Sequence, residues 1–282
     1  SVVFTQPPQK SHRGQKINKS PIQGISETLN IDYRTPKTLK DNHEEYEFLK
    51  ELNADLAIVC AYGQIIPENF LNLTKKGFVN IHASILPSWR GAAPIQRSIM
   101  NLDPETGISI MKIKKELDSG PVSNIYKIKI DQNQNAQEIS EKLSALAAEK
   151  ILDNVDDILE DKAKFIDQDH SKATYAKKID KEESRIDWDE DASKIIGKIN
   201  GLFPSPGASF SFNGERYKIL KAEIGNGIGQ VGEIISNQLE VACNKNQSIK
   251  ILEIQRQGKR PQKISEFMLG SQIKKGSKLS NV

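Results

Sequence analysis

Two polar residues end a short apolar run, and their side chains can support acyl transfer. Asn80 and His82 lie at the end of GFVNIH, residues 77–82, and Asp118 follows in ELDSGP, residues 116–121. An amide can donate a hydrogen bond to an oxygen that gains negative charge, and an imidazole can move a proton near neutral pH. This set contains no serine or cysteine nucleophile, so we expect the attacking atom to belong to the substrate.

The same residues also have a purely structural explanation. His82 would then be a core histidine whose ring is satisfied by a backbone carbonyl, and Asp118 would be an ordinary turn residue. The chain has no Walker, HExxH or GxSxG motif, which argues against P-loop, zinc-protease and serine-hydrolase sites. Residue types and spacing alone leave both explanations open.

Apolar runs separated by helical patterns indicate the scaffold that would position these residues. Residues 55–62 and 78–82 are continuous apolar runs, typical of parallel strands buried on both faces, and residues 107–113 form a third. An edge strand is expected at residues 123–130, and amphipathic helices at 42–52, 94–100 and 136–159. The pattern predicts a Rossmann-like, doubly wound α/β domain with a mainly parallel sheet. Such a sheet binds ligands at the carboxyl ends of its strands.

After residue 203 the pattern changes to short strands separated by turns. The cluster FPSPG, residues 203–207, breaks the preceding helical pattern. Short β patterns follow at residues 208–212, 217–221, 229–235, 239–243 and 249–254, which predicts a small β-barrel. We therefore expect a catalytic domain at residues 1–185, a linker and helix at 186–203, and the barrel with a basic tail at 204–282.

Basic residues gather near both ends of a chain whose net charge is only +3. Residues 9–20 and 255–278 are both rich in lysine and arginine. Prominent among their cations are Lys10, Arg13, Lys16, Lys259 and Arg260. This distribution favours a polyanionic partner, and solvated loops with a floppy tail are the alternative.

Composition and cysteine placement indicate a soluble protein of the cytoplasm. The chain has 282 residues, of which 37% are hydrophobic and 27% charged. No apolar stretch approaches the roughly 20 residues of a membrane span, and no signal peptide is visible. Cys60 and Cys243 lie in apolar, strand-like runs without metal-type spacing. We expect both to be buried, reduced thiols, and we expect no metal site.

Six stretches together resemble the methionyl-tRNA formyltransferases, a branch of the folate-dependent formyltransferase family. They are NIHASILPSWRGAAPIQ at residues 80–96, VFTQP at 3–7, RGQK at 13–16, AYG at 61–63, LDSG at 117–120 and RIDW at 185–188. The Asn-x-His and Asp set is common to the folate-dependent formyltransferases of this fold. The WRGAAPIQ continuation, the basic loop and the C-terminal barrel are more specific.

The resemblance implies a reaction and a catalytic set. Asn80, His82 and Asp118 would be catalytic. The formyl group would pass from N10 of 10-formyltetrahydrofolate to the α-amino group of methionine on initiator tRNA, which enables translation initiation. The implied folate-binding residues are Tyr62, Gly63, Ser84, Ile85, Leu86 and Pro87. No metal is implied, and the family is generally monomeric.

The resemblance also implies where initiator methionyl-tRNA binds. Lys10, Arg13 and Lys16 would lie in a basic loop against the acceptor end, and Lys259 and Arg260 on an OB-like C-terminal barrel. Two other functions stay open. One is formyl transfer to a small amine, such as glycinamide ribonucleotide or an amino sugar nucleotide. The other is RNA binding without catalysis, and the intact catalytic set argues against it.

The resemblance also has one departure, at the front of the chain. The first strand and first helix of the family, roughly its opening thirty residues, are absent from this sequence. Because that strand is central in the family's sheet, its loss would leave backbone groups unpaired. We therefore expect this chain alone to be poorly soluble or weakly active, and to be rescued by the upstream residues.

Overall fold

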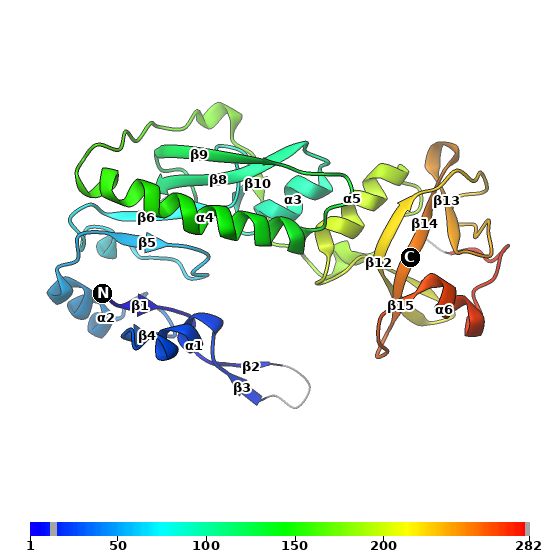
Figure 1. The fold of residues 1–282 in the computed structure, drawn as a ribbon, viewed down its shortest axis with the longest axis horizontal. Coiled ribbons are helices and arrows are strands. Elements are labelled where there is room, and N and C mark those ends of the chain that lie inside the picture. The colour runs from blue at the N-terminus through cyan, green and yellow to red at the C-terminus, as the bar shows by residue number, and fades with distance from the viewer. Residues whose placement is uncertain (12–15, 280–282) are drawn as a thin grey trace. The chain divides into compact units, whose positions relative to one another are not determined.

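The computed structural model describes residues 1–11 and 16–279 (Figure 1). For Lys10, Ser11 and Lys16 it describes the backbone alone. The α-helices are α1 Pro21–Thr28, α2 His43–Leu52, α3 Pro94–Met100, α4 Ala136–Leu159, α5 Ala192–Leu202 and α6 Ile264–Gly270. Short 3-10 helices lie at Glu68–Phe70, His170–Lys172, Glu182–Ser184 and Asn244–Asn246. The strands are β1 Val3–Phe4, β2 Gln9–Ser11, β3 Lys16–Asn18, β4 Tyr33–Arg34, β5 Ala57–Val59, β6 Phe78–His82, β7 Arg90–Gly91, β8 Glu105–Lys112, β9 Val122–Lys129, β10 Tyr175–Ala176, β11 Ser209–Phe212, β12 Glu215–Ile224, β13 Glu240–Cys243, β14 Gln247–Arg256 and β15 Gln262–Lys263.

The chain divides into two compact units. The first contains Ser1–His82, Ile108–Ile125 and Ala147–Ser171. The second contains Ala83–Gly107, Tyr126–Leu146 and Lys172–Val282. Each unit is therefore built from segments that are interleaved along the sequence.

A four-stranded sheet in the order β5-β6-β8-β9 contains the expected apolar strands. β5 and β6 run parallel, but β6 and β8 are antiparallel, with His82 opposite Ser109. The expectation of a parallel strand at residues 107–113 is therefore wrong. A strand buried on both faces has the same continuous apolar pattern in either direction.

The three helices expected in the α/β part are present as α2, α3 and α4. α3 and α4 have the expected bounds, and α2 starts one residue later because Asn42 is its N-cap. α1 was not predicted; Ser20 caps it and Pro21 lies in its first turn. Ile139 and Leu143 of α4 are buried, as the amphipathic pattern requires.

The last part of the chain forms an antiparallel sheet in the order β11-β12-β14-β13, with β15 paired to β14. Four of the five expected short strands are present, as β11, β12, β13 and β14. Residues 229–235 instead make isolated bridges, Ile234 with Val241 and Glu233 with Lys278, and Gly232 has a φ of +79°. The fold is therefore mixed α/β with a separate antiparallel sheet in the last part of the chain, and closure into an OB-like barrel stays a prediction.

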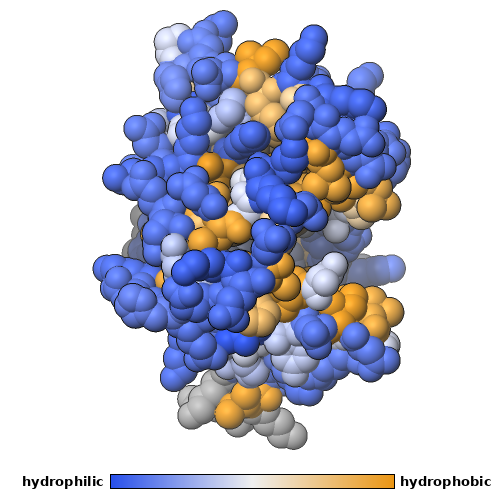
Figure 2. Space-filling view, turned by 90° about the vertical axis from the view of Figure 1, so that its left-hand side faces the viewer, coloured by the Kyte–Doolittle hydropathy of each residue, from blue (hydrophilic) through white to orange (hydrophobic). Residues whose placement is uncertain are grey.

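In the described chain β5 lies at one end of the four-stranded sheet, and residues expected to be buried are exposed there. Ile58 of β5 is 47% exposed, and Cys60, which follows β5, is exposed, whereas Cys243 is buried. The prediction of buried thiols is therefore wrong for Cys60, because an end strand is covered along one edge only. Figure 2 shows one face of the molecule, on which separate hydrophobic patches lie among larger hydrophilic areas.

Candidate active site at the end of strand β6

Strand β6 carries Asn80 and His82 near its carboxyl end. Successive side chains of a strand point to opposite faces, so these two share one face. His82 is 6% exposed and lies opposite Ser109 of β8, which is fully buried. Asn80 is half-buried and pairs with Val59 of β5 and Met111 of β8. Paired backbone on both sides therefore fixes the position of Asn80, and pairing with β8 fixes that of His82.

The loop after β8 brings Asp118 to His82. Because β8 is antiparallel to β6, it ends beside the start of β6, where the Ile113 N–H donates to the Phe78 carbonyl at 2.8 Å. Residues 113–121 then lead back towards the end of β6. The Asp118 Oδ2 atom lies 3.6 Å from His82 Nδ1. The two side chains come together as expected, but by a loop that folds back and not at two neighbouring carboxyl ends.

The loop that carries Asp118 is closely packed. Asp118 has a left-handed backbone conformation, with a φ of +46°. A Cβ atom on Gly120 would lie 1.9 Å from the Lys112 carbonyl oxygen. Ser119 is buried, and its hydroxyl donates to the Glu116 carbonyl at 3.1 Å. Residue 120 therefore has to be glycine for the loop to approach β8 this closely.

Gln168 also belongs to this site, and the sequence analysis missed it. Its side-chain amide donates to the carbonyls of Asp118, at 2.9 Å, and Gly120, at 2.7 Å, and the residue is 8% exposed. The surrounding stretch is polar and has no apolar periodicity, and its partners lie 50 and 48 positions earlier in the chain. No local pattern could therefore have identified this residue.

The arrangement can support proton transfer and oxyanion stabilisation at an acyl group. A buried imidazole beside a carboxylate has a defined orientation, and the Asn80 amide can donate to an oxygen that gains charge. Within residues 1–11 and 16–279, no group of three or more His, Cys, Asp and Glu side chains could hold a metal ion. The helices of the same residues include none with the length and apolar character that crossing a membrane requires.

Tyr62 and Gly63, expected at the folate pocket, lie in the first unit. The ring of Tyr62 packs on the core cluster of Leu39, Leu49 and Phe70, and burial raises the pKa of its hydroxyl to about 12. Its carbonyl accepts a hydrogen bond from Gln6 Nε2 at 2.7 Å. Gly63 is exposed, with a φ of +76°. Of these two residues, Gly63 is therefore the one with backbone surface left for a ligand.

The other residues expected at the folate pocket, 84–87, form a tight turn in the second unit. Ser84 is fully buried and its hydroxyl donates to the Ser88 carbonyl at 2.6 Å, while the Ser88 N–H donates to the Ile85 carbonyl at 3.0 Å. Leu86 is buried, and Ile85 and Pro87 are half-buried. Of these side chains, Ile85 and Pro87 are the ones with surface left for a ligand.

The first basic segment forms the hairpin of β2 and β3. Lys10 pairs with Ile17 and Ser11 with Lys16, so Lys10 and Lys16 lie on adjoining strands. The side chains of both lysines lie outside the described residues, as does the whole of Arg13. The structure therefore describes the paired strands β2 and β3, and the contacts of these three cations lie outside the described residues.

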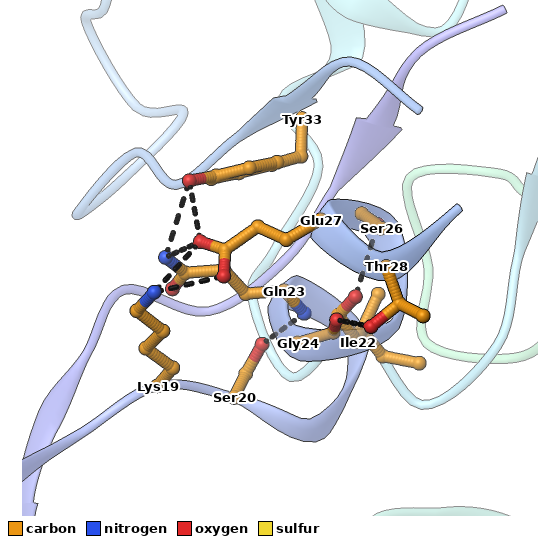
Figure 3. A network of polar contacts seen from close by, with 9 residues as sticks. All are labelled: Lys19, Ser20, Ile22, Gln23, Gly24, Ser26, Glu27, Thr28 and Tyr33. Carbon is orange, nitrogen blue, oxygen red and sulfur yellow. Dashed lines mark hydrogen bonds and ion pairs between the residues drawn. The ribbon is translucent and has the colours of Figure 1, made fainter. Parts of the chain in front are cut away.

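Polar contacts fix the base of this hairpin (Figure 3). Thr5 Oγ1 and Ser20 Oγ, on either side of the hairpin, are 2.8 Å apart. Lys19 Nζ donates to both carboxylate oxygens of Glu27 in α1, at 2.9 and 2.8 Å, and the Tyr33 hydroxyl donates to Glu27 at 2.8 Å. These hydrogen bonds lower the pKa of Glu27 to about 2, and the bond from Lys19 has the largest effect.

Lys259 and Arg260 lie in the turn between β14 and β15, and both are exposed. The Lys259 N–H donates to the Arg256 carbonyl at 3.0 Å, and Gln255 Nε2 donates to the Lys259 carbonyl at 2.9 Å. The turn therefore has a defined backbone and presents both cations to solvent.

Comparison with known proteins places these features in context. The formyl transferase family matches residues 1–155, and the C-terminal domain of formyl transferases matches residues 178–272. A methionyl-tRNA formyltransferase of Pelagibacter ubique (strain HTCC1062) is 67% identical over 281 residues, which cover 100% of this chain and 91% of that protein. Another, of Mesorhizobium japonicum, is 38% identical over 291 residues, covering 99% of this chain and 91% of that protein.

Two solved structures are similar in fold. WlaRD, a sugar 3N-formyl transferase crystallised with dTDP and 5-N-formyl-THF, has a TM-score of 0.67 and 18% identity, covering 92% of this chain and 98% of that one. HypX from Aquifex aeolicus, in complex with tetrahydrofolic acid, has a TM-score of 0.65 and 17% identity, covering 95% of this chain and 46% of that one. At these identities the likeness concerns the fold alone.

Proposed function

Because this chain belongs to the formyl transferase family, we propose that it transfers the formyl group of 10-formyltetrahydrofolate to the α-amino group of methionine on initiator methionyl-tRNA. The observation that carries this proposal is the 67% identity, along the whole chain, to a protein named methionyl-tRNA formyltransferase. Transfer to a small amine has weaker support, because the sugar formyl transferase of similar fold shares only 18% identity.

The residues of the site fit a formyl-folate co-substrate. They supply an amide donor at Asn80 and an imidazole–carboxylate pair, His82 Nδ1 and Asp118 Oδ2, separated by 3.6 Å. They include no nucleophile that would have to form a covalent intermediate with the formyl group. Such a set suits direct attack by a substrate amine on an activated formyl carbon.

Each residue then has a definite task. When bound, 10-formyltetrahydrofolate supplies the formyl carbon on N10. The α-amino nitrogen forms the new C–N bond as the bond to N10 breaks, and Asn80 and His82 stabilise the negative charge on the formyl oxygen. Asp118 holds the imidazole and helps to move the proton lost by the amine towards N10, which leaves protonated. The formyl group thus passes from N10 to the amine, and one proton passes from the amine to N10.

The folate-binding residues carried over from the family differ in the surface that they leave for a ligand. Gly63 is exposed, whereas the Tyr62 ring packs in the core and the Tyr62 carbonyl accepts a hydrogen bond from Gln6. In the turn at residues 84–87, surface is left on Ile85 and Pro87. Contacts from backbone and apolar side chains suit a flat aromatic ligand, which is typical of small-molecule pockets.

Cations at two places would bind the tRNA. The proposed phosphate contacts come from Lys10 and Lys16 on β2 and β3, from Arg13, which lies between them in the sequence, and from Lys259 and Arg260. Such contacts supply affinity and salt dependence more than sequence choice. In this proposal residues 1–185 form the catalytic domain, 186–203 a linker and helix, and 204–282 an OB-like tRNA-binding domain. The protein would act as a monomer in the cytoplasm.

The direct test uses the protein with 10-formyltetrahydrofolate and either methionyl initiator tRNA or an amino sugar nucleotide as acceptor. We expect formyl-methionyl-tRNA and no formylated sugar. Formylation of the amino sugar nucleotide but not of the tRNA would overturn the proposal in favour of a small-amine formyltransferase.

A further inference from the structure

Gln168 connects the segment after α4 to the loop that carries Asp118. Its Nε2 atom donates to the carbonyls of Asp118 at 2.9 Å and Gly120 at 2.7 Å. Nearby, Ile166 and Val122 exchange backbone hydrogen bonds of 2.9 and 2.8 Å. Four hydrogen bonds therefore join residues 166–168 to residues 118–122, and all of these residues belong to the first unit.

The loop needs such support, because its backbone conformation is unfavourable. Asp118 has a φ of +46°, in the left-handed region that residues with a Cβ atom adopt only at a cost, which is smaller for aspartate than for most. A conformation of this kind persists only when its surroundings determine it. Gln168 donates hydrogen bonds to the carbonyl of Asp118 itself and to that of Gly120, and so supports this part of the loop.

We infer that Gln168 is a positioning residue for the formyl transfer proposed above: its side-chain amide holds the loop so that the Asp118 carboxylate stays beside the His82 imidazole. Gln168 reaches the chemistry only through Asp118, whose Oδ2 atom lies 3.6 Å from His82 Nδ1. The expected loss of kcat rests on the proposed function. The expected effect on the position of the loop does not.

Only a glutamine-like side chain satisfies both carbonyls. The amide NH₂ group has two hydrogens, one for each carbonyl oxygen. Glutamate has the same shape but would present an oxygen to those carbonyl oxygens, and methionine has similar length and no donor. Because the residue is 8% exposed, water cannot readily replace the lost donors.

The kinetic test compares Gln168→Met with the wild type on methionyl initiator tRNA. Displacement of a reacting group by 1 Å can cost a factor of about 100, so we expect kcat to fall roughly 10- to 100-fold while the KM for the tRNA stays within about twofold. In an Asp118→Asn background the same change should have almost no further effect on kcat, because the group it positions is gone. Equal effects in both backgrounds would overturn the inference.

A matched control removes a similar hydrogen bond elsewhere in the first unit. Asn154 is buried in α4, and its Nδ2 donates to the Lys150 carbonyl at 2.7 Å. Asn154→Leu should leave kcat within about twofold of the wild type, and thermal unfolding of both variants separates a loss of stability from a loss of kcat. Equal losses of kcat in the two variants would mean that Gln168 is merely structural.

A second measurement does not depend on activity. Amide hydrogen exchange of residues 113–121 should become faster in Gln168→Met and not in Asn154→Leu. Unchanged exchange in Gln168→Met would overturn the inference even if the enzyme formylates tRNA. Faster exchange in a protein that formylates only another amine would uphold it and overturn the proposed tRNA substrate alone.

Discussion

Replacing Gly120 by alanine tests how closely the Asp118 loop must approach β8. The new Cβ atom would lie 1.9 Å from the Lys112 carbonyl oxygen, whereas ordinary contacts start at 3.4 Å, so the loop or the strand end must move by about 1.5 Å. A misplacement of about 1 Å can cost a factor of roughly 100 in rate. We therefore expect kcat to fall by about that factor and the free energy of unfolding to fall by about 1–3 kcal/mol, the usual cost of overpacking.

Two assays separate these effects, and a second glycine provides the control. Formylation rates at saturating substrates report kcat, and thermal unfolding reports stability. Gly24 lies in α1, where an added Cβ atom would meet nothing within 4 Å. Gly24→Ala should therefore be neutral or stabilise the protein by about 0.4–1 kcal/mol, with unchanged kcat. Wild-type kcat and stability in Gly120→Ala would refute the close approach of the loop to β8.

Three further changes address the chemistry, the tRNA contact and the hairpin base. His82→Ala should lower kcat at least about 100-fold at little cost in folate affinity; a loss below tenfold would remove His82 from the chemistry. Arg13→Ala should raise the KM for tRNA and flatten its salt dependence, and an unchanged salt slope would argue against a phosphate contact. Glu27→Gln should lower the melting temperature above pH 4.5, where the carboxylate bonded by Lys19 is charged in both folded and unfolded chains. Because the pKa of Glu27 is lowered to about 2 in the folded chain, the stability that this carboxylate contributes is lost as the pH falls from 4.5 through 2. The difference in melting temperature between Glu27→Gln and the wild type should therefore vanish near pH 2. A difference in melting temperature that does not change with pH would contradict this.

Features that depend on neighbouring residues could be predicted from the sequence. α4 has the predicted bounds because its apolar residues, such as Ile139 and Leu143, recur at helical spacing over many turns. Asn80 and His82 share a face because strand alternation is local. The nearness of Asp118 to His82 could be expected only in outline, since it depends on the path of a loop.

Features that depend on pairing between distant segments could not be predicted. The direction of β8 depends on its partner, and its apolar run is compatible with either direction. Cys60 is exposed because β5 is an end strand, which the apolar run alone does not reveal. The strand expected at 229–235 is absent, and Gly232 has a left-handed φ in its place. Gln168 was missed because nothing near it in the chain marks its role.

The position of Gln168 along the chain matters for anyone who divides this protein into modules. The match to the formyl transferase family ends at residue 155 and the match to its C-terminal domain begins at residue 178, so Gln168 lies in neither. A fragment cut at residue 155 would keep Asn80, His82 and Asp118 and still lose the amide that holds the loop. A fragment meant to keep the inferred support of the Asp118 loop therefore has to extend at least through residue 168, into the stretch between the two family matches.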